Sequence, residues 1–535
     1  MKWLYAAGML CVPLILFLFQ SSRLDPYDEG IMLMHGMMME RGFLPGRDHY
    51  STYGPLSYFA VGKLFTLGDG NPFFVRTYYA AAHAIAVVGF TMILRPWRSL
   101  VDFVSAVLLT VILLFVFVIW QWPTNPSFII PSLCALFMLV ALMRDDVEDR
   151  PMSALRVAAT FVVLLLPLVF LRPVVAGVLG AGLIAAVPFH LHNHGRLGAN
   201  ELLAQGAGIL GALVALALAV LAFELATDNA LSALLTSLGS IGTDTYERYR
   251  GLPFPPVTSP LELDTAFIYL PVLLVVLCGA IYFVALIKRD LFSPGEKDAI
   301  LFLLVFSGGL YSLNIVRTDL AHAVPSLLAA TALAAFIVNS VLKRALRGVG
   351  IKGYAMVAGV LLLAMLPLMK DVLFARSYNR ILIDCDRSLV VNPPYNCLDM
   401  GDERHDAVRD ELRARLQDDE PFLSANMRHD IIYTNNVSHY ALVGHGPLTY
   451  WAQMDPGVHT TERIQREIVA DIERTIGAYG RALVVLEEHG PSNEPNESDE
   501  PSGVLILDDR LADCDRLIRH EPTWQYGALE LRECR

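Results

Sequence analysis

Three carboxylates near the N-terminus have a spacing that favours catalysis in this 535-residue chain. Asp25, Asp28 and Glu29 fall within five positions, directly after an apolar segment at residues 3–20. Pro26 cannot donate a backbone hydrogen bond, so we expect a helix to end before it and another to begin near Asp28, where a helix N-terminus favours anions. Three carboxylates exceed what helix capping requires. A carboxylate that reaches a substrate O–H or N–H is a suitable general base.

A second group of charged residues falls between two later apolar segments. The run Arg317-Thr-Asp319-Leu-Ala-His322 places two charges and an imidazole within six positions. Charged groups at a membrane boundary are costly unless they have partners, so this cluster favours a functional site. Arg172 lies between two apolar segments, and Arg248 lies in a long connection between two others. The alternative for each arginine is a side chain that only extends toward lipid phosphates.

The elements that must position these residues are apolar segments that recur along the first 370 residues. The chain is 54% hydrophobic and 18% charged, against about 25% charge in an average soluble domain. Segments of about 20 residues match a hydrocarbon core of roughly 30 Å. This pattern excludes a soluble multidomain enzyme and predicts an α-helical polytopic membrane protein. About eleven transmembrane helices are expected, at 3–20, 73–94, 101–120, 127–143, 155–171, 173–190, 203–225, 266–287, 299–316, 321–341 and 353–369.

The charges of the connections predict an orientation for these helices. Lysine and arginine gather on alternate connections, whereas the opposite short connections, such as 121–126, carry almost none. The positive-inside rule places the basic connections in the cytoplasm. With about eleven segments, the N-terminus is then cytoplasmic and the C-terminal region emerges on the outside.

The C-terminal region differs from the rest of the chain in charge. Residues 371–535 contain 17 arginines, no lysine and 31 acidic residues, a net charge of −14, whereas residues 1–370 carry +2. An acidic region argues against nucleic acid as a partner, because phosphate binding needs clustered cations. Residues 371–535 are therefore predicted to form a small acidic, extracytoplasmic α/β domain. We expect helices at 402–416 and 460–477 and strands at 431–443, 482–486 and 504–507.

Four cysteines fall in this C-terminal region: Cys385, Cys397, Cys514 and Cys534. Four cysteines permit three pairings, of which the local pairs 385–397 and 514–534 are the simplest. An even number of thiols confined to this region favours disulfides and an oxidising compartment. This agrees with the orientation that the basic connections predict.

The first external loop, residues 21–71, carries the most informative pattern. It contains the acidic group, a methionine-rich segment at 31–41 suited to the membrane interface, a turn at 42–46 and a Pro-Leu-x-Tyr segment at 55–58. We expect the turn to return Asp48 toward the acidic group. An acidic pair after the first helix, followed by two short helices around G-x-x-P-x-x-D, resembles the GT-C superfamily of membrane glycosyltransferases. The likeness is closer to bacterial members of the protein-mannosyltransferase and aminoarabinose-transferase kind.

This resemblance implies a reaction and roles for particular residues. Such enzymes take a sugar from a polyprenyl-phosphate donor and pass it to a cell-envelope glycan, lipid or protein, with inversion at the anomeric carbon. The resemblance makes Asp28 the general base, with Glu29 beside it. Asp25, Asp48 and Tyr53 would support the acceptor side. Cations that stabilise the leaving phosphate would come from Arg317, His322, Arg172 and Arg248.

The resemblance also implies a GT-C-like transmembrane catalytic domain at residues 1–370, whose acidic loop spans 21–72, in a bacterial-type inner membrane among membrane lipids. A divalent cation, Mg or Mn, would find ligands in Glu29, Asp48 and His322, although no spacing here is diagnostic of a metal. Two other interpretations stay open, a multi-pass transporter or flippase and a catalytically silent scaffold with the same fold. A transporter would be expected to show repeated halves and charges in mid-membrane, which the sequence does not show.

Overall fold

Ten of the eleven expected membrane segments are helical in the computed structural model, and the segment at 353–369 lies outside the described residues. The structure describes residues 2–20, 24–25, 27–119, 125–142, 152–241, 248–256, 263–315, 317–345, 403–431, 433–454, 457–488, 496–522 and 527–535. Cys385, Cys397 and the expected domain boundary at residue 371 therefore lie outside them.

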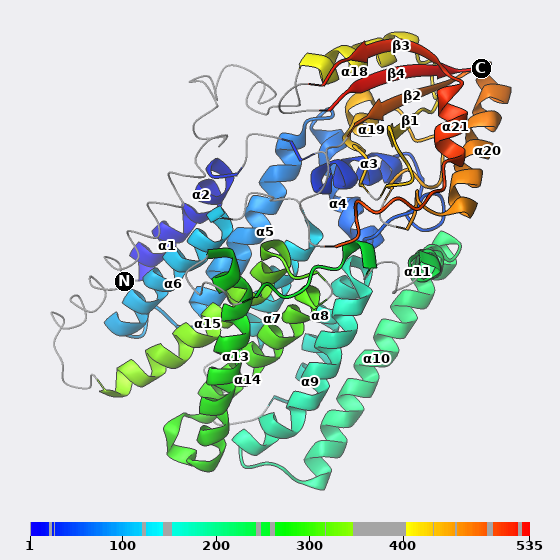
Figure 1. Ribbon diagram of the computed structural model, residues 1–535. Helices are drawn as coiled ribbons and strands as arrows, with labels where there is room; N and C mark the ends of the chain where they lie inside the picture. The colour runs from blue at the N-terminus through cyan, green and yellow to red at the C-terminus, as the bar shows by residue number, and fades with distance from the viewer. Residues whose placement is uncertain are drawn as a thin grey trace. The chain divides into compact units, whose positions relative to one another are not determined.

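The helices of the apolar segments have bounds close to those expected. They are α1 (Lys2–Leu10), α2 (Val12–Leu18), α5 (Pro72–Met92), α6 (Leu100–Ile119), α7 (Ile130–Leu142), α8 (Ala154–Leu171), α9 (Pro173–Asn193), α10 (Ala199–Thr227), α13 (Leu263–Ile287), α14 (Pro294–Tyr311) and α15 (Leu320–Ala345). Within the described residues, seven helices are long and apolar enough to cross a membrane. These are α5, α6, α8, α9, α10, α13 and α15, so the predicted polytopic helical class is confirmed (Figure 1).

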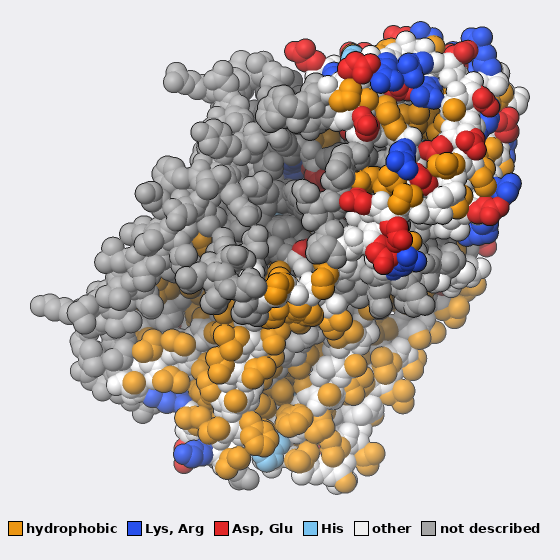
Figure 2. All heavy atoms as spheres, in the orientation of Figure 1, with side chains coloured by type: hydrophobic (Ala, Val, Ile, Leu, Met, Phe, Trp, Pro, Cys, Tyr) orange, Lys and Arg blue, Asp and Glu red, His pale blue; other side chains and the backbone are white. Residues whose placement is uncertain are grey.

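The chain divides into two compact units that do not follow chain order. Unit 1 consists of residues 1–21, 76–222 and 254–384, and unit 2 of residues 22–75, 223–253 and 385–535. The first external loop and the acidic C-terminal region thus belong to the same unit. Apolar side chains cover the helices of unit 1, whereas charged side chains gather over the sheet and helices of unit 2 (Figure 2).

Helix α14 is central to the packing of unit 1, where it contacts α9, α13 and α15. Helices α9 and α14 run antiparallel, because Gly309 meets Leu179 whereas Asp298, near the other end of α14, bonds Asn193 at 2.9 Å. Ser293 begins α14 with a capping box in which its side chain and that of Glu296 satisfy each other's backbone N–H groups.

A four-stranded mixed sheet forms the centre of the C-terminal part of unit 2. Its order is β1-β2-β4-β3, with β1 parallel to β2 and the other neighbours antiparallel. The strands are β1 (Leu423–Asn426), β2 (Ala482–Glu487), β3 (Asp515–His520) and β4 (Leu529–Cys534). Helices α20 (Glu462–Tyr479) and α21 (Ile506–Ala512) bury apolar residues against Leu486 and its neighbours. Side chains alternate along a strand, so Glu487 points to the opposite face, where it bonds His405 of α18 (Glu403–Arg415).

The C-terminal α/β class is confirmed, although some expected elements were wrong. Helices α18 and α20 and strand β2 lie where they were predicted. The expected strand at 431–443 instead ends in helix α19 (Ser438–Val443), and the one at 504–507 leads into α21. A turn built by Asn436, whose side chain accepts from Ser438 N–H at 3.2 Å, starts α19 and breaks the extended pattern.

The two short helices of the first external loop are α3 (Asp28–Glu40) and α4 (Pro55–Leu67), and they pack on each other. The expectation that the methionine-rich helix lies in the membrane interface was wrong. Every residue from Glu29 to Met38 is buried, because α3 is apolar on all sides and packs against α4 and α19. Exposed apolar side chains are found instead on α4, at Phe59 and Leu67.

The first external loop is bound to the C-terminal part of unit 2 by backbone and side-chain contacts. Tyr50 N–H donates to the Tyr450 carbonyl at 2.8 Å, and the Tyr450 hydroxyl donates to the Gly46 carbonyl at 2.9 Å. His35 Nε2 lies 3.2 Å from Gln453 Oε1. Tyr50 is also part of the apolar core over the sheet. The acidic loop is therefore held by residues about 400 positions away.

One of the two local disulfides that the cysteine spacing favours is present, between Cys514 and Cys534. It joins the residue before β3 to the last residue of β4. This confirms a disulfide in the C-terminal region.

Candidate active site

The acidic group of the first loop forms the start of α3. The Asp25 carbonyl accepts from Gly30 N–H at 3.0 Å, and its side chain accepts from Tyr27 N–H at 3.0 Å. Asp25 N–H in turn donates to Glu29 Oε2 at 3.3 Å. Asp28 and Glu29 occupy the first turn of the helix, as the sequence predicted. The helix N-terminus and these backbone donors stabilise negative charge in this place.

Burial separates the three carboxyl groups. Glu29 is fully buried, whereas Asp25 and Asp28 are partly exposed. Burial, reinforced by the negative charge of Asp28, raises the pKa of Asp25 from its usual value near 4 to about 8. At neutral pH Asp25 therefore holds a proton, which relieves repulsion within the group. A carboxyl group whose pKa is raised by burial and a neighbouring charge is typical of functional sites.

The C-terminal part of unit 2 contributes to this acidic site. Burial raises the pKa of Tyr27, as does the charge of Glu487, and a hydrogen bond to Thr434 partly offsets the effect. A Cβ atom on Gly30 would lie 2.9 Å from Ser438 N, so α3 and α19 begin in contact. Sequence reasoning missed Thr434, which lies in a loop, and Glu487, which ends β2. Both are more than 400 positions from Tyr27, and no local sequence pattern indicates that they lie near it.

Two supporting residues of the predicted site lie elsewhere in the first loop. The Asp48 carboxylate pairs with Arg47 at 2.6 Å and accepts from Leu44 N–H at 2.7 Å. Burial would raise its pKa, but these partners lower the pKa overall. Asp48 follows the C-terminal end of α3, about 20 Å along the helix from its acidic start. Tyr53 is buried, and its backbone N–H bonds the Ser51 hydroxyl at 3.2 Å.

In unit 1, Asp319 brings Arg317 and His322 together. Arg317 Nε donates to Asp319 at 2.9 Å, and His322 Nδ1 lies 2.7 Å from its other oxygen. The same carboxylate accepts from His322 N–H at 2.9 Å and so caps the start of α15. Burial would raise the pKa of Asp319, but the bond and charge of His322 and the charge of Arg317 lower it. The cluster expected from the sequence is thus assembled around one carboxylate.

Arg172 and Arg317 lie at the same end of unit 1. Arg172 separates α8 from α9, with Pro173 beginning α9, and its N–H donates to the Leu168 carbonyl at 2.7 Å. Because α9 and α14 are antiparallel, the start of α9 lies beside the end of α14, which leads to Arg317. The histidines at the end of α9 bond Asp298 at the opposite end.

Arg76, in the first turns of α5, reaches this same end of unit 1. Helices α5 and α7 run parallel, since Ser132 bonds Ala82 and Arg95 bonds Leu142. Helix α7 ends beside the start of α8, so the first turns of α5 lie at the Arg172 end. The Arg76 side chain is only 1% exposed, which is rare for an arginine.

Arg248 is engaged by acidic residues of unit 2. Its guanidinium pairs with Glu497 and lies 2.9 Å from Glu500, both in an acidic loop of the C-terminal region. It also lies over the Tyr249 ring. A phosphate that bound Arg248 would have to displace these carboxylates.

Two groups of the described residues bring three metal-ligating side chains together. One is His190, His194 and Asp298, and the other is His405, His439 and Glu487. In the first, His190 Nδ1 and His194 Nε2 each lie 2.8 Å from Asp298 Oδ2, which is a hydrogen-bond distance. Met152 N–H donates to the remaining nitrogen of His190 at 3.0 Å, so that imidazole is satisfied without an ion.

The chain has the fold of ArnT from Cupriavidus metallidurans. The apo crystal structure of that protein is matched with a TM-score of 0.51 at 13% identity, over 99% of this chain and 97% of ArnT. The structure bound to undecaprenyl phosphate is matched with a TM-score of 0.56 at 12% identity, over 99% and 98%. The GT-C resemblance drawn from the first loop is therefore confirmed at the level of fold. No protein-family model matches the sequence, and no curated protein matches it.

Proposed function

We propose that this protein is a membrane glycosyltransferase that moves a sugar from a polyprenyl-phosphate donor to an acceptor outside the cytoplasm. The observation that carries the proposal is the pair of carboxylates, Asp28 and Glu29, in the first turn of α3, in a chain with the ArnT fold along 99% of its length. The ArnT structure bound to undecaprenyl phosphate supports a donor with this kind of carrier.

Asp28 acts as the general base in this proposal. The acceptor hydroxyl or amine attacks the anomeric carbon, and its proton passes to the Asp28 carboxylate. The bond from the anomeric carbon to the phosphate oxygen breaks, and its electron pair leaves with the polyprenyl phosphate. One displacement of this kind inverts the anomeric centre. Asp28 fits the role because it is partly exposed, whereas Glu29 beside it is fully buried.

The leaving phosphate needs positive charge in a site with little water. Arg317, His322 and Arg172 lie at one end of unit 1, and this supports their role on the donor side. Asp319 holds the first two in place. Arg248 is also proposed to bind the donor phosphate, which would replace Glu497 and Glu500 as partners of its guanidinium group.

The orientation proposed for the chain places its N-terminus in the cytoplasm and its C-terminal region in the periplasm or outside the cell. The Cys514–Cys534 disulfide supports an oxidising compartment for that region. Charged pairs such as Arg344–Glu296 lie at the opposite end of unit 1 from Arg172, which fits a cytoplasmic face.

The test uses the full chain purified in detergent and a panel of polyprenyl-phosphate sugars that differ in the sugar. Release of polyprenyl phosphate and thermal stabilisation are measured for the parent, for Asp28→Asn and for Glu40→Gln. Glu40 is a matched control because it lies at the other end of α3, paired with Lys63 at 2.8 Å.

We expect one sugar donor to be turned over by the parent and by Glu40→Gln. Asp28→Asn should bind that donor with turnover reduced by about 100-fold or more, since general-base catalysis contributes roughly 10²–10⁴-fold. Full turnover in Asp28→Asn would refute the assignment of the base. A parent protein that neither binds nor turns over any polyprenyl-phosphate sugar would favour a transporter or a silent scaffold.

A further inference from the structure

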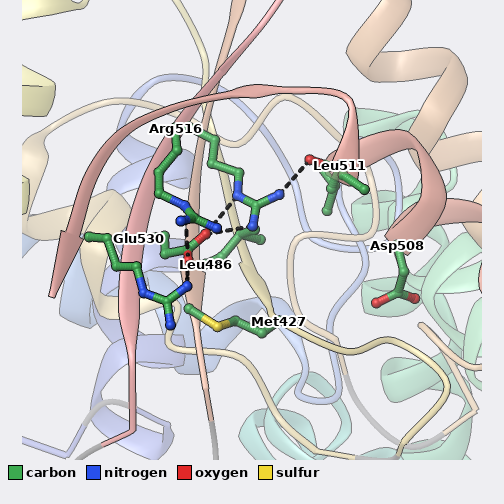
Figure 3. Close-up of a pocket in the computed structure, with 9 residues that line it drawn as sticks. Met427, Leu486, Asp508, Leu511, Arg516 and Glu530 are labelled. Atoms are coloured by element: carbon green, nitrogen blue, oxygen red, sulfur yellow. Dashed lines mark hydrogen bonds and ion pairs between the residues drawn. The ribbon is translucent and has the colours of Figure 1, made fainter. Parts of the chain in front are cut away.

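A cavity of about 240 Å³ opens in the C-terminal part of unit 2, between α21 and the strands β3 and β4. Its lining includes three arginines, Arg516, Arg519 and Arg532, together with Glu530 and Asp508. None of the residues proposed above for the glycosyl transfer lines it. The cavity is therefore a separate feature of the fold (Figure 3).

One buried carboxylate holds the three guanidinium groups together. Glu530 is 1% exposed and lies 3.2 Å from Arg516 Nε, 3.0 Å from Arg519 Nη1 and 2.6 Å from Arg532 Nη2. Figure 3 shows the guanidinium groups gathered around it. Glu530 and Glu521, which pairs with Arg519, together neutralise two of the three charges. This cluster therefore has one guanidinium group more than it has carboxylates, in a region that carries a net charge of −14.

The three arginines differ in how many other partners their guanidinium groups have. Arg532 also donates to the Leu511 carbonyl at 2.8 Å, and Arg519 also pairs with Glu521 at 2.7 Å. Arg516 has a half-exposed side chain, and its ion pair within the described residues is the one with Glu530. An incoming anion would meet Arg516 without displacing a second carboxylate. A guanidinium suits such a ligand because its fixed fork of donors matches carboxylate and phosphate oxygens.

The opposite wall offers a hydrogen-bond acceptor. Asp508 accepts from His429 N–H at 3.0 Å, which fixes its carboxylate on α21. Met427, Leu486 and Leu511 add apolar surface. A fixed carboxylate binds hydroxyl donors, and an apolar surface fits the C–H face of a sugar ring. The cavity is smaller than the roughly 300–1,000 Å³ of sites for drug-sized ligands, and suits one ring with a charged substituent.

We propose that this cavity binds a monosaccharide unit that carries a negative charge, as a sugar phosphate or a uronic acid. The anionic group binds the arginines, the hydroxyls bind Asp508, and the ring lies over the apolar residues. The inference is independent of the proposed glycosyl transfer, because binding here needs neither the donor nor Asp28.

The test measures equilibrium binding of small probes to the full chain in detergent by titration calorimetry. The probes are glucose 6-phosphate, glucuronate, uncharged glucose and inorganic phosphate. We expect glucose 6-phosphate or glucuronate to bind at least about tenfold more tightly than glucose and than phosphate, and to weaken as salt rises. Equal binding of glucose and the charged sugars would refute the role of the arginines. Phosphate that binds as tightly as glucose 6-phosphate would refute recognition of the sugar.

Two variants test whether the charged sugar binds in this cavity. Arg516→Gln should weaken the charged sugar by about tenfold or more, while Arg519 and Arg532 still hold Glu530 and keep the strands in place. Arg474→Gln is the matched control, because it removes an exposed arginine that pairs with Asp471 on α20. Unchanged affinity in Arg516→Gln, or an equal loss in Arg474→Gln, would overturn the proposal. The unfolding temperature of each variant shows whether it is folded.

Discussion

Gly36 of α3 and Gly62 of α4 lie in backbone contact within the first external loop. A Cβ atom on Gly36 would fall 2.8 Å from the Gly62 backbone nitrogen, and one on Gly62 would meet the Gly36 carbonyl. The two helices can approach this closely only because neither position has a side chain. This contact helps to hold α3, and with it the acidic group at its first turn.

Gly36→Ala is expected to destabilise the protein by about 1–3 kcal/mol, because the added methyl group must push two packed backbones apart. Thermal unfolding in detergent measures the effect. Gly206→Ala in α10 is the control, since nothing lies within 4 Å of its added Cβ. There the alanine should leave stability unchanged or raise it slightly, through its better helix propensity. A Gly36→Ala protein as stable as the parent would show that the helices separate at little cost.

His49 is expected to make the protein sensitive to acid. It is 1% exposed and stacks on His35 with ring centroids 4.6 Å apart, and burial lowers its pKa from 6.5 to about 3. In the unfolded chain His49 binds a proton near pH 6.5, whereas in the folded chain it stays neutral until the pH is much lower. The free energy of unfolding therefore falls as the pH drops from 6.5 toward 3. At pH 5 this costs about 2 kcal/mol.

His49→Phe keeps a flat ring over His35 and removes the titration. The variant should therefore gain stability over the parent at pH 5, and the gain should vanish at pH 8. Unfolding midpoints at the two pH values measure this difference. A gain that is equal at both values would mean that packing, and not protonation, is responsible.

Asp25 is expected to have the opposite dependence on pH. Its folded pKa of about 8 lies above its usual value near 4, so the folded protein holds a proton that the unfolded chain has lost. Stability therefore falls as the pH rises from about 4 to 8 and is level beyond. Asp25→Asn keeps an oxygen to accept from Tyr27 N–H but cannot ionise.

We expect Asp25→Asn to unfold at a higher temperature than the parent at pH 8 and at the same temperature at pH 4. The same two-pH series on Glu40→Gln controls for the loss of a carboxyl group from this loop. Curves for Asp25→Asn and the parent that run parallel between pH 4 and 8 would show that Asp25 titrates normally.

The helices of unit 1 could be predicted because long apolar segments have few alternatives in a membrane. The strands β3 and β4 were missed because their sequences, DRLIRH and LELREC, are rich in charges that pair across the sheet. Arg519 and Glu530, which are register partners, show how such a pattern hides a strand.

The candidate site could be predicted only where its residues are close in sequence. Asp25, Asp28 and Glu29 form one helix start, and Arg317, Asp319 and His322 form another, so spacing alone brought each set together. The hydrogen bond between Tyr27 and Thr434 joins residues about 400 positions apart, and the charge of Glu487 also acts on Tyr27. It depends on how α3 packs against α19, which no local pattern records.

Asp319 is expected to have two separable roles, and two substitutions distinguish them. Its carboxylate caps α15 through His322 N–H, and it holds the Arg317 guanidinium at 2.9 Å. Asparagine is as good a cap as aspartate, whereas alanine cannot cap, so Asp319→Ala should lose about 1 kcal/mol of stability that Asp319→Asn keeps. Both variants lose the charge that positions Arg317 and His322.

Under the proposed function, both should therefore raise the KM for the polyprenyl-phosphate sugar, because the cations no longer point to one place. Unfolding temperatures and donor titrations of the two variants measure these effects. A KM that rises only in Asp319→Ala would show that Asp319 acts through the helix alone and that its charge does not position the arginine.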